Sequence, residues 1–365
     1  MKNILGFLLR SQIQCSKQAQ SPNGFTLIEL LVGMVMAVLV ITPLLGFMID
    51  IMNTENREQA KSSSEQEIQA ALDYIAQDVE QAVYIYDADG MHGATITNID
   101  GTSTTIDGII GQIPNTDGGN RFPVLAFWKR NFLARSQTVT LSNGTEPTVG
   151  CLVRLPTTSN CNDQDYQVYS LVVYYLIKEP ATTTWNNTTT RIARWEIRDG
   201  IRDASGTETR FEGTPPAAVK YLLLPNPNFK SFDLASAGDL RRKLGNWKNF
   251  SNSVSSYNLN VNKLNTLVDF IDQTPNTAGS PAPVACNTAA GEQQVPDYNS
   301  IGFPNTFKTG SFYACVDAKK YIARVYIRGN SLARIQPGAT YNSGKAAYFP
   351  TATIQIKGRG FLGVE

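Results

Sequence analysis

The sequence predicts an α+β protein in which one long N-terminal helix precedes a β-rich head. Leu30 to Ile49 contains no charged side chain, and these twenty residues, at about 1.5 Å each in a helix, span the ~30 Å hydrocarbon core of a bilayer. An apolar stripe with spacings of three and four residues follows, which predicts that the helix continues. Beyond Asp87 the apolar residues alternate in short runs, a pattern typical of strands. We therefore expect a membrane anchor, a continuing helix and a head.

The first 24 residues form the expected leader. They contain no acidic side chain and three basic ones, Lys2, Arg10 and Lys17. Basic residues before an apolar span favour a cytoplasmic N-terminus, so the chain beyond Ile51 should be exported. No A-x-A pattern directly follows the apolar run that ends near Ile51, which favours cleavage before that run over an ordinary secretory signal.

Glu29 places a carboxylate at the start of the apolar segment. A carboxylate facing lipid costs on the order of 2.5 kcal/mol at the helix centre and less near the interface. Glu29 therefore needs a cationic partner.

The stretch Gly24-Phe25-Thr26-Leu27-Ile28-Glu29 resembles the cleavage signature of type IV prepilins and type II secretion pseudopilins. The resemblance implies that prepilin peptidase cuts after Gly24 and that Phe25 becomes the N-methylated terminus. It also implies that Glu29 meets the N-terminal ammonium of a neighbouring subunit, which supplies the missing cation. The alternative is a plain signal anchor in which Glu29 occurs by chance.

This resemblance also implies a pilin-like architecture, in which the helix is a spine packed on an antiparallel sheet with large loop-rich insertions. The expected segments are the leader 1–24, a transmembrane or filament-core helix 25–52, its amphipathic continuation 53–86, and a head 87–365 with an insertion at about 199–310. The implied partners are other pilins or pseudopilins, the inner-membrane assembly platform, prepilin peptidase, and membrane lipid before assembly. The chain is then a single-pass inner-membrane protein with an exported head, and later part of a pilus or pseudopilus.

Within the helix, Pro43 removes a backbone hydrogen bond and clashes with the preceding turn. Together with Gly46 it predicts a kink or a locally melted stretch over 39–46. The stripe of the continuing helix predicts a spine of about sixty residues. Its members are Ile68, Leu72, Ile75, Val79, Val83 and Tyr86.

In the head, both alternating faces of 166–178 are largely apolar, which predicts a central strand covered on both sides. Residues 191–198 predict a strand with Arg194, Glu196 and Arg198 on a wet face. Helices are expected at 237–244 and 264–272, and further strands at 93–99, 104–110, 123–128, 321–328 and 351–357. The head resembles the larger minor pseudopilins of type II secretion and type IV pili, and its end resembles large cyanobacterial pseudopilins linked to polysaccharide secretion.

Four of the five cysteines follow the leader, which contains Cys15. Three pairings are possible, and an exported compartment allows them to oxidise. The local pairing is favoured because each bridge closes a polar loop: Cys151 with Cys161 and Cys286 with Cys315. A zinc site is the alternative, but the chain has no C-x-x-C and one histidine, His92.

The sequence predicts no enzyme, no cofactor and no metal site. His92 sits among glycines, 302–309 departs from a phosphate loop at Phe307 and Pro304, and Asp163 and Asp165 with Asn162 lack the spacing of a calcium loop. The net charge of +1 argues against nucleic acid as a partner, because such domains are usually strongly basic.

The expected function is that of a minor pseudopilin, a structural subunit at or near a filament tip that supports priming, secretion of a cargo such as polysaccharide, or motility. The alternative is a pilus-borne adhesin that binds anionic glycans through a basic strand face. Its candidate residues are Arg194, Arg198, Arg324 and Arg328. An exported enzyme is a third class, and no catalytic constellation supports it.

Overall fold

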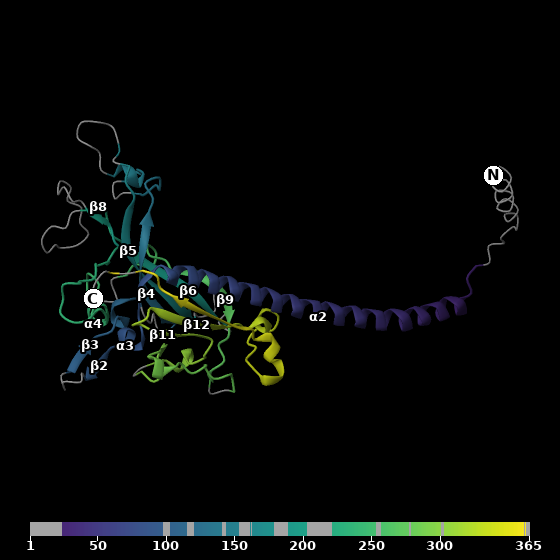
Figure 1. Cartoon of the computed structure of the whole chain (residues 1–365). Helices are drawn as coiled ribbons and strands as arrows, with labels where there is room; N and C mark the ends of the chain where they lie inside the picture. Colours follow the sequence, from purple (N-terminus) through teal and green to yellow (C-terminus); the bar gives the residue numbers. More distant parts are fainter. Residues whose placement is uncertain are drawn as a thin grey trace, which may run out of the picture. The chain divides into compact units, whose positions relative to one another are not determined.

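The computed structural model describes residues 24–97, 103–114, 120–140, 144–152, 161, 163–178, 189–202, 221–252, 257–276, 279–300, 303–360 and 362. It confirms the α+β class, with one long N-terminal apolar helix and antiparallel sheets (Figure 1). The chain divides into two compact units, 1–56 and 57–365. The expected leader lies outside the described residues, apart from Gly24.

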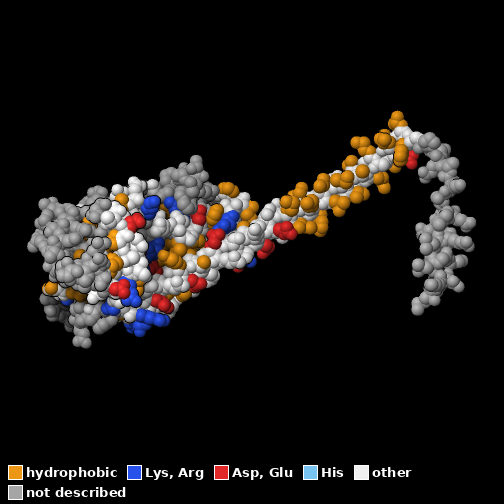
Figure 2. Space-filling view, turned by 90° about the horizontal axis from the view of Figure 1, so that it is seen from above, with side chains coloured by type: hydrophobic (Ala, Val, Ile, Leu, Met, Phe, Trp, Pro, Cys, Tyr) orange, Lys and Arg blue, Asp and Glu red, His pale blue; other side chains and the backbone are white. Residues whose placement is uncertain are grey.

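The long helix, α2, runs from Leu27 to Glu80 and contains 54 residues. Its first half is exposed throughout and almost continuously apolar (Figure 2). The helix is long and apolar enough to cross a membrane. It passes through Pro43 and Gly46 without a break, so the melted stretch predicted at 39–46 is not present. Pro43 deprives one carbonyl of its donor, but the helix is continuous across it. The kink that was the other predicted outcome stays a prediction.

The prediction that the spine reaches Tyr86 is wrong, because α2 ends at Glu80. The next residues form β1, Ala82–Ile85, and are buried throughout. β1 pairs with a second strand, and Tyr84 lies opposite Trp128. Val83 and Tyr86 keep helical spacing in the sequence, but Val, Tyr and Ile in a row also favour a strand. Pairing with the sheet decides between the two.

The larger sheet has five antiparallel strands in the order β1-β4-β5-β6-β9. Their bounds are β4 Arg121–Leu133, β5 Tyr166–Ile177, β6 Thr190–Arg198 and β9 Asn265–Ile271. β5 is central and mostly buried, as predicted. The helix expected at 264–272 is wrong, since β9 occupies it. Val268 and Ile271 are spaced as on a helix, but they are buried where β9 extends the sheet beside β6.

A second sheet has the order β10-β11-β12-β13 and is also antiparallel. Its strands are β10 Gln293–Val295, β11 Phe312–Asp317, β12 Ile322–Arg328 and β13 Thr351–Lys357. β12 and β13 confirm predicted strands, whereas β10 and β11 were not predicted. Because β9 and β10 both fall within 199–310, that segment is not simply a loop-rich insertion, for it contributes a strand to each sheet.

Short elements complete the described head. Two strand pairs are β2 Ala94–Thr97 with β3 Ser103–Ile106, and β7 Ile201–Arg202 with β8 Tyr221–Leu223. Two short helices are α3 Ala88–His92 and α4 Leu240–Gly245. The strand expected at 104–110 is shorter than predicted. β3 ends at Ile106, and Ile110–Gln112 forms a 3-10 turn. α4 confirms part of the helix expected at 237–244.

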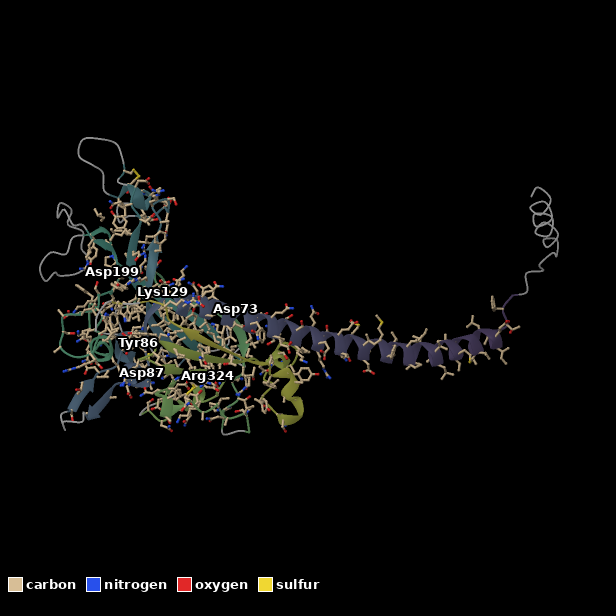
Figure 3. The ribbon with its side chains drawn as sticks, viewed as in Figure 1. Asp73, Tyr86, Asp87, Lys129, Asp199 and Arg324 are labelled. Carbon is tan, nitrogen blue, oxygen red and sulfur yellow. A yellow bond between two sulfur atoms is a disulfide. The ribbon has the colours of Figure 1, made fainter. Side chains whose placement is uncertain are left out.

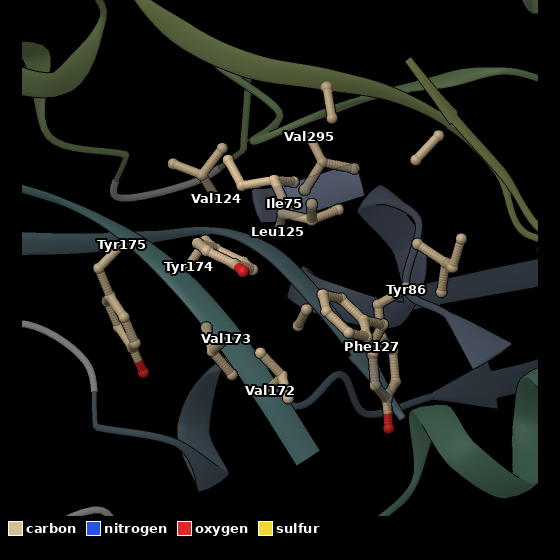
Figure 4. Packing of buried hydrophobic residues seen from close by; sticks show 14 of the residues in the cluster. Ile75, Tyr86, Val124, Leu125, Phe127, Val172, Val173, Tyr174, Tyr175 and Val295 are labelled. Atoms are coloured by element: carbon tan, nitrogen blue, oxygen red, sulfur yellow. The ribbon is translucent and has the colours of Figure 1, made fainter. Parts of the chain in front are cut away.

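One hydrophobic core joins the second part of α2 to both sheets. Figure 4 shows Ile75 of the helix among residues of β4 and β5 and close to Val295 of β10. The buried face of α2 consists of Ala60, Ser64, Ile68, Ala71, Leu72, Ile75, Asp78 and Val79. All but two of these side chains are apolar, which confirms the stripe up to Val79.

The head contains two disulfides, Cys151–Cys161 and Cys286–Cys315. This is the favoured local pairing, and it removes these thiols from the zinc alternative. Glu292 lies near the second bridge, but its carboxylate pairs with Arg324.

We expect the longer bridge to stabilise the fold more. The chain-entropy model gives about 3.5 kcal/mol for the Cys286–Cys315 separation of 29 residues and about 2.7 kcal/mol for the Cys151–Cys161 separation of 10. Thermal denaturation should therefore show a larger fall in Tm for Cys286→Ser/Cys315→Ser than for Cys151→Ser/Cys161→Ser. The reverse order would show that the entropy of the unfolded chain does not control the effect.

Candidate functional site

The motif residues Gly24 and Phe25 lie at the start of α2 and point into open space. A Cβ built on Gly24 meets nothing within 4 Å, so the described fold gives no steric reason for glycine there. The Phe25 side chain is 81 % exposed. The described fold thus contains no contact that fixes the identity of either residue.

Two further glycines, Gly33 and Gly46, lie inside the apolar half of α2 and also meet nothing within 4 Å. Glycine in a helix interior costs roughly 1 kcal/mol relative to alanine. Small residues on membrane helices let neighbouring helices approach closely. Within the described residues, no contact requires glycine at either position.

Thr26 and Glu29 form a local cap at the helix start. The Thr26 hydroxyl oxygen accepts a hydrogen bond from the Glu29 N–H at 3.3 Å, and the Thr26 carbonyl accepts from Leu30 N–H at 3.1 Å. The T-x-x-E spacing is that of a capping box, and a carboxylate in the first turn is favoured by the helix dipole. This cap uses the backbone N–H of Glu29, so its carboxylate is left for the assembly role that the resemblance implies.

The strongest charged cluster in the head centres on Asp78 of α2. Its carboxylate receives Lys129 Nζ at 2.6 Å, Arg194 Nε at 2.7 Å and the Tyr174 hydroxyl at 2.8 Å. These donors come from β4, β6 and β5, so one acid of the helix binds the three central strands. The Asp78 side chain is 6 % exposed. Lys129, labelled in Figure 3, lies close to α2.

The pKa of Asp78 reflects two opposing causes. Desolvation by burial favours the neutral acid, but the hydrogen bond and charge of Arg194, followed by those of Lys129, outweigh it and lower the pKa. Burial of the Tyr174 hydroxyl, together with the Asp78 charge, raises the pKa of Tyr174 well above its ordinary value. Asp78 is therefore ionised in the folded head and holds the helix to the sheet by charge-assisted bonds.

The basic face proposed for an adhesin is not formed. Arg194 and Arg198 lie on β6 in one sheet, and Arg324 and Arg328 lie on β12 in the other. Carboxylates neutralise three of the four: Asp78 and Glu196 bind Arg194, Glu292 binds Arg324, and Asp272 binds Arg328.

The alternation predicted for β6 is confirmed, with Arg194, Glu196 and Arg198 on its less buried face. That face is only partly wet, because the Arg194 side chain is 11 % exposed. The sequence could not reveal this, since Asp78 lies 116 residues away. Alternation along β6 indicated which residues share a face, but not that α2 covers that face.

The remaining residues that were considered as catalytic, calcium or phosphate sites form local structural contacts instead. His92 ends the short helix α3, and burial lowers its pKa. Asp163 pairs with Arg135, and Asp165 accepts from the Arg135 N–H at 2.6 Å. Asn162 lies outside the described residues. In 303–309, Asn305–Phe307 forms a 3-10 turn with Phe307 buried, which is unlike a phosphate loop.

Comparison of the chain with protein-family models, curated proteins and solved structures finds no match in any of the three.

Sequence reasoning missed Asp78, Lys129 and Tyr174, and it assigned Arg194 to a basic face instead of to this cluster. The signal was a lone acid inside the apolar stripe, between Ile75 and Val79. Acids rarely occupy a buried face unless they are paired. That pattern would have singled out Asp78, but it would not have named Lys129, Tyr174 or Arg194.

Proposed function

We propose that this chain is a minor pseudopilin, a non-enzymatic subunit that is stored in the inner membrane and then added to a pilus or pseudopilus. The single observation that carries the proposal is the Gly24-to-Glu29 motif, placed at the start of a helix whose apolar half is exposed and of membrane-spanning length. Cleavage after Gly24 leaves Phe25 as the new N-terminus, directly before the capped first turn.

Three further observations support this proposal. Gly24, Gly33 and Gly46 have no steric explanation within the described chain, as expected if a peptidase and neighbouring helices impose them. The two disulfides suit a head exported to an oxidising compartment. The Asp78 cluster and the shared core join the helix firmly to both sheets, as a subunit held by its helix requires. The proposed partners are other pilins, the assembly platform and prepilin peptidase.

Gly24→Asp tests the processing step. A Cβ at this position meets open space, so the variant should fold and enter the membrane as the wild type does. In cells with active prepilin peptidase, immunoblots should show shortened wild-type chain and full-length Gly24→Asp chain. Wild-type protein in cells lacking the peptidase gives the position of the uncut form. Normal shortening of Gly24→Asp would contradict the proposal.

The adhesin alternative gains no support from its original residues, since they are divided between two sheets and mostly paired with acids. Priming of the filament and support of secretion or motility remain the proposed role.

A further inference from the structure

A hollow of about 340 Å³ opens around α4, and none of its lining residues belongs to the N-terminal motif or to the Asp78 cluster. Four cationic side chains line it: Lys230, Arg242, Lys243 and Lys248. The lining contains one carboxylate, that of Asp233. Lys248 pairs with Asp107 outside the lining, so four cations against these two anions leave an excess of two positive charges at this hollow, in a chain whose net charge is +1.

The basic residues of α4 are divided between two sides. Arg241 turns towards α3, where its NH2 lies 2.7 Å from Asp87 Oδ2 and also pairs with Asp89 (Figure 3 labels Asp87). Arg242 and Lys243 line the hollow instead. Among the residues that the structure describes, no carboxylate pairs with either of them or with Lys230. The charge on one side of α4 is thus neutralised within the fold, and the charge on the other side is not.

Local structure constrains the side chains of Arg242 and Lys248 and the backbone of Lys230. Gly238 has a φ of +109°, and a Cβ there would lie 2.6 Å from Cδ of Arg242. Glycine therefore lets the Arg242 side chain fold back against the loop. Trp247 Nε1 donates to the Lys230 carbonyl at 2.8 Å, which ties the Lys230 loop to the end of α4. Lys248 Nζ lies 2.9 Å from Asp107 Oδ2.

Arg242, Lys243 and Lys248 are all half-buried. Like charges that are held together and partly shielded from water repel one another, and a bound anion removes that repulsion. Guanidinium and ammonium groups make charge-assisted hydrogen bonds to carboxylate, sulfate and phosphate oxygens. The hollow is therefore chemically matched to an anion.

We propose that this hollow binds an anionic unit of a carbohydrate polymer, through the carboxylate, sulfate or phosphate that the unit carries. The volume is near the lower end of the roughly 300–1,000 Å³ range of small-ligand sites, which suits a short stretch of polymer. Ser231, Ser236 and Asn246 also line the hollow and place polar groups beside the cations, as hydroxyl-rich sugars require. Trp247 is 3 % exposed and offers no open ring for stacking nucleic-acid bases.

Binding of defined polymers by the full chain in neutral detergent micelles tests the proposal. Dextran sulfate and polygalacturonate should bind, neutral dextran should not, and affinity should fall as salt rises. Arg242→Gln and Lys243→Gln should each weaken binding about tenfold to a hundredfold, because each removes a charge-assisted contact. Arg242→Lys keeps the charge and should retain most of the binding. Lys319→Gln removes an exposed cation from the turn between β11 and β12 and should change binding less than twofold.

Three results would overturn the inference. The first is absence of binding to both polyanions. The second is an equal loss in Lys319→Gln and Arg242→Gln, which would mean general charge attraction. The third is single-stranded DNA that binds as tightly as the charged polysaccharides and through the same residues, which would remove the carbohydrate assignment. Thermal denaturation of each variant, with Tm unchanged, shows that the fold is intact.

Discussion

Asp78→Asn should lower the free energy of unfolding by about 3–5 kcal/mol, the usual cost of removing one partner of a buried ion pair. The variant keeps the shape of the side chain but leaves Lys129 and Arg194, each with a side chain 11 % exposed, without their shared anion. Arg194 retains Glu196 at 2.7 Å, so Lys129 should account for most of the loss. Urea denaturation of the full chain, followed by fluorescence of the buried Trp128 and Trp195, measures it.

Asp73→Asn is the matched control. Asp73 lies on the same helix and is exposed (labelled in Figure 3). The free energy of unfolding of Asp73→Asn should therefore stay within about 0.5 kcal/mol of the wild-type value. Equal stabilities of Asp78→Asn and Asp73→Asn would show that the buried cluster does not hold α2 to the sheet.

The same cluster predicts a pH dependence. The folded-state pKa of Asp78 lies below its unfolded value, which is ordinarily about 3.9. Its contribution is therefore fully present above the unfolded pKa and is lost as the pH falls through the lower, folded pKa. The stability difference between wild type and Asp78→Asn should be constant near neutral pH and should shrink below about pH 4. A difference that grows on acidification would contradict the assigned ionisation.

Loss of filament assembly without loss of folding is the expected result for Glu29→Leu. In an apolar environment, the carboxylate and the N-terminal ammonium of a neighbouring subunit would each offset the other's desolvation and fix the register between helices. Removing the charge makes the segment more apolar, so membrane insertion and cleavage should continue. Complementation of secretion or motility in a strain lacking the wild-type protein should fail, together with cross-linking to other pilins.

Glu29→Gln separates the charge of the side chain from its polarity. The Thr26 cap uses the N–H of residue 29 and is kept in both variants, while glutamine also keeps a polar side chain of the same length. The proposed charge pair predicts that Glu29→Gln fails in assembly as Glu29→Leu does. Normal assembly by Glu29→Gln and failure by Glu29→Leu would show that a polar side chain, and not the charge, is required.

The sequence predicted the elements whose signal is local. The uncharged run of α2, the doubly apolar β5 and the C-terminal strands β12 and β13 were all predicted because periodicity within each segment determines them. β1 and β9 were not, because their apolar spacing fits a helix as well as a strand. Long-range pairing settled both, with β4 for β1 and with β6 for β9.

The candidate sites divide in the same way. The N-terminal motif is contiguous, so its residues could be identified without a fold. The Asp78 cluster joins residues as far as 116 positions apart, and no pattern in the sequence relates them. The supposed basic face failed for a related reason. Its arginines were identified from strand alternation, whereas all of their carboxylate partners except Glu196 come from α2 or from segments outside the two arginine-bearing strands.

Mass spectrometry of the mature N-terminus tests the central claim most directly. Protein purified from membranes of cells with active prepilin peptidase should begin at N-methylated Phe25 and should contain no peptide from residues 1–24. An intact Met1 terminus in such cells, or a terminus beyond Ile51 as an ordinary secretory signal would leave, would contradict the assignment of this chain as a pseudopilin.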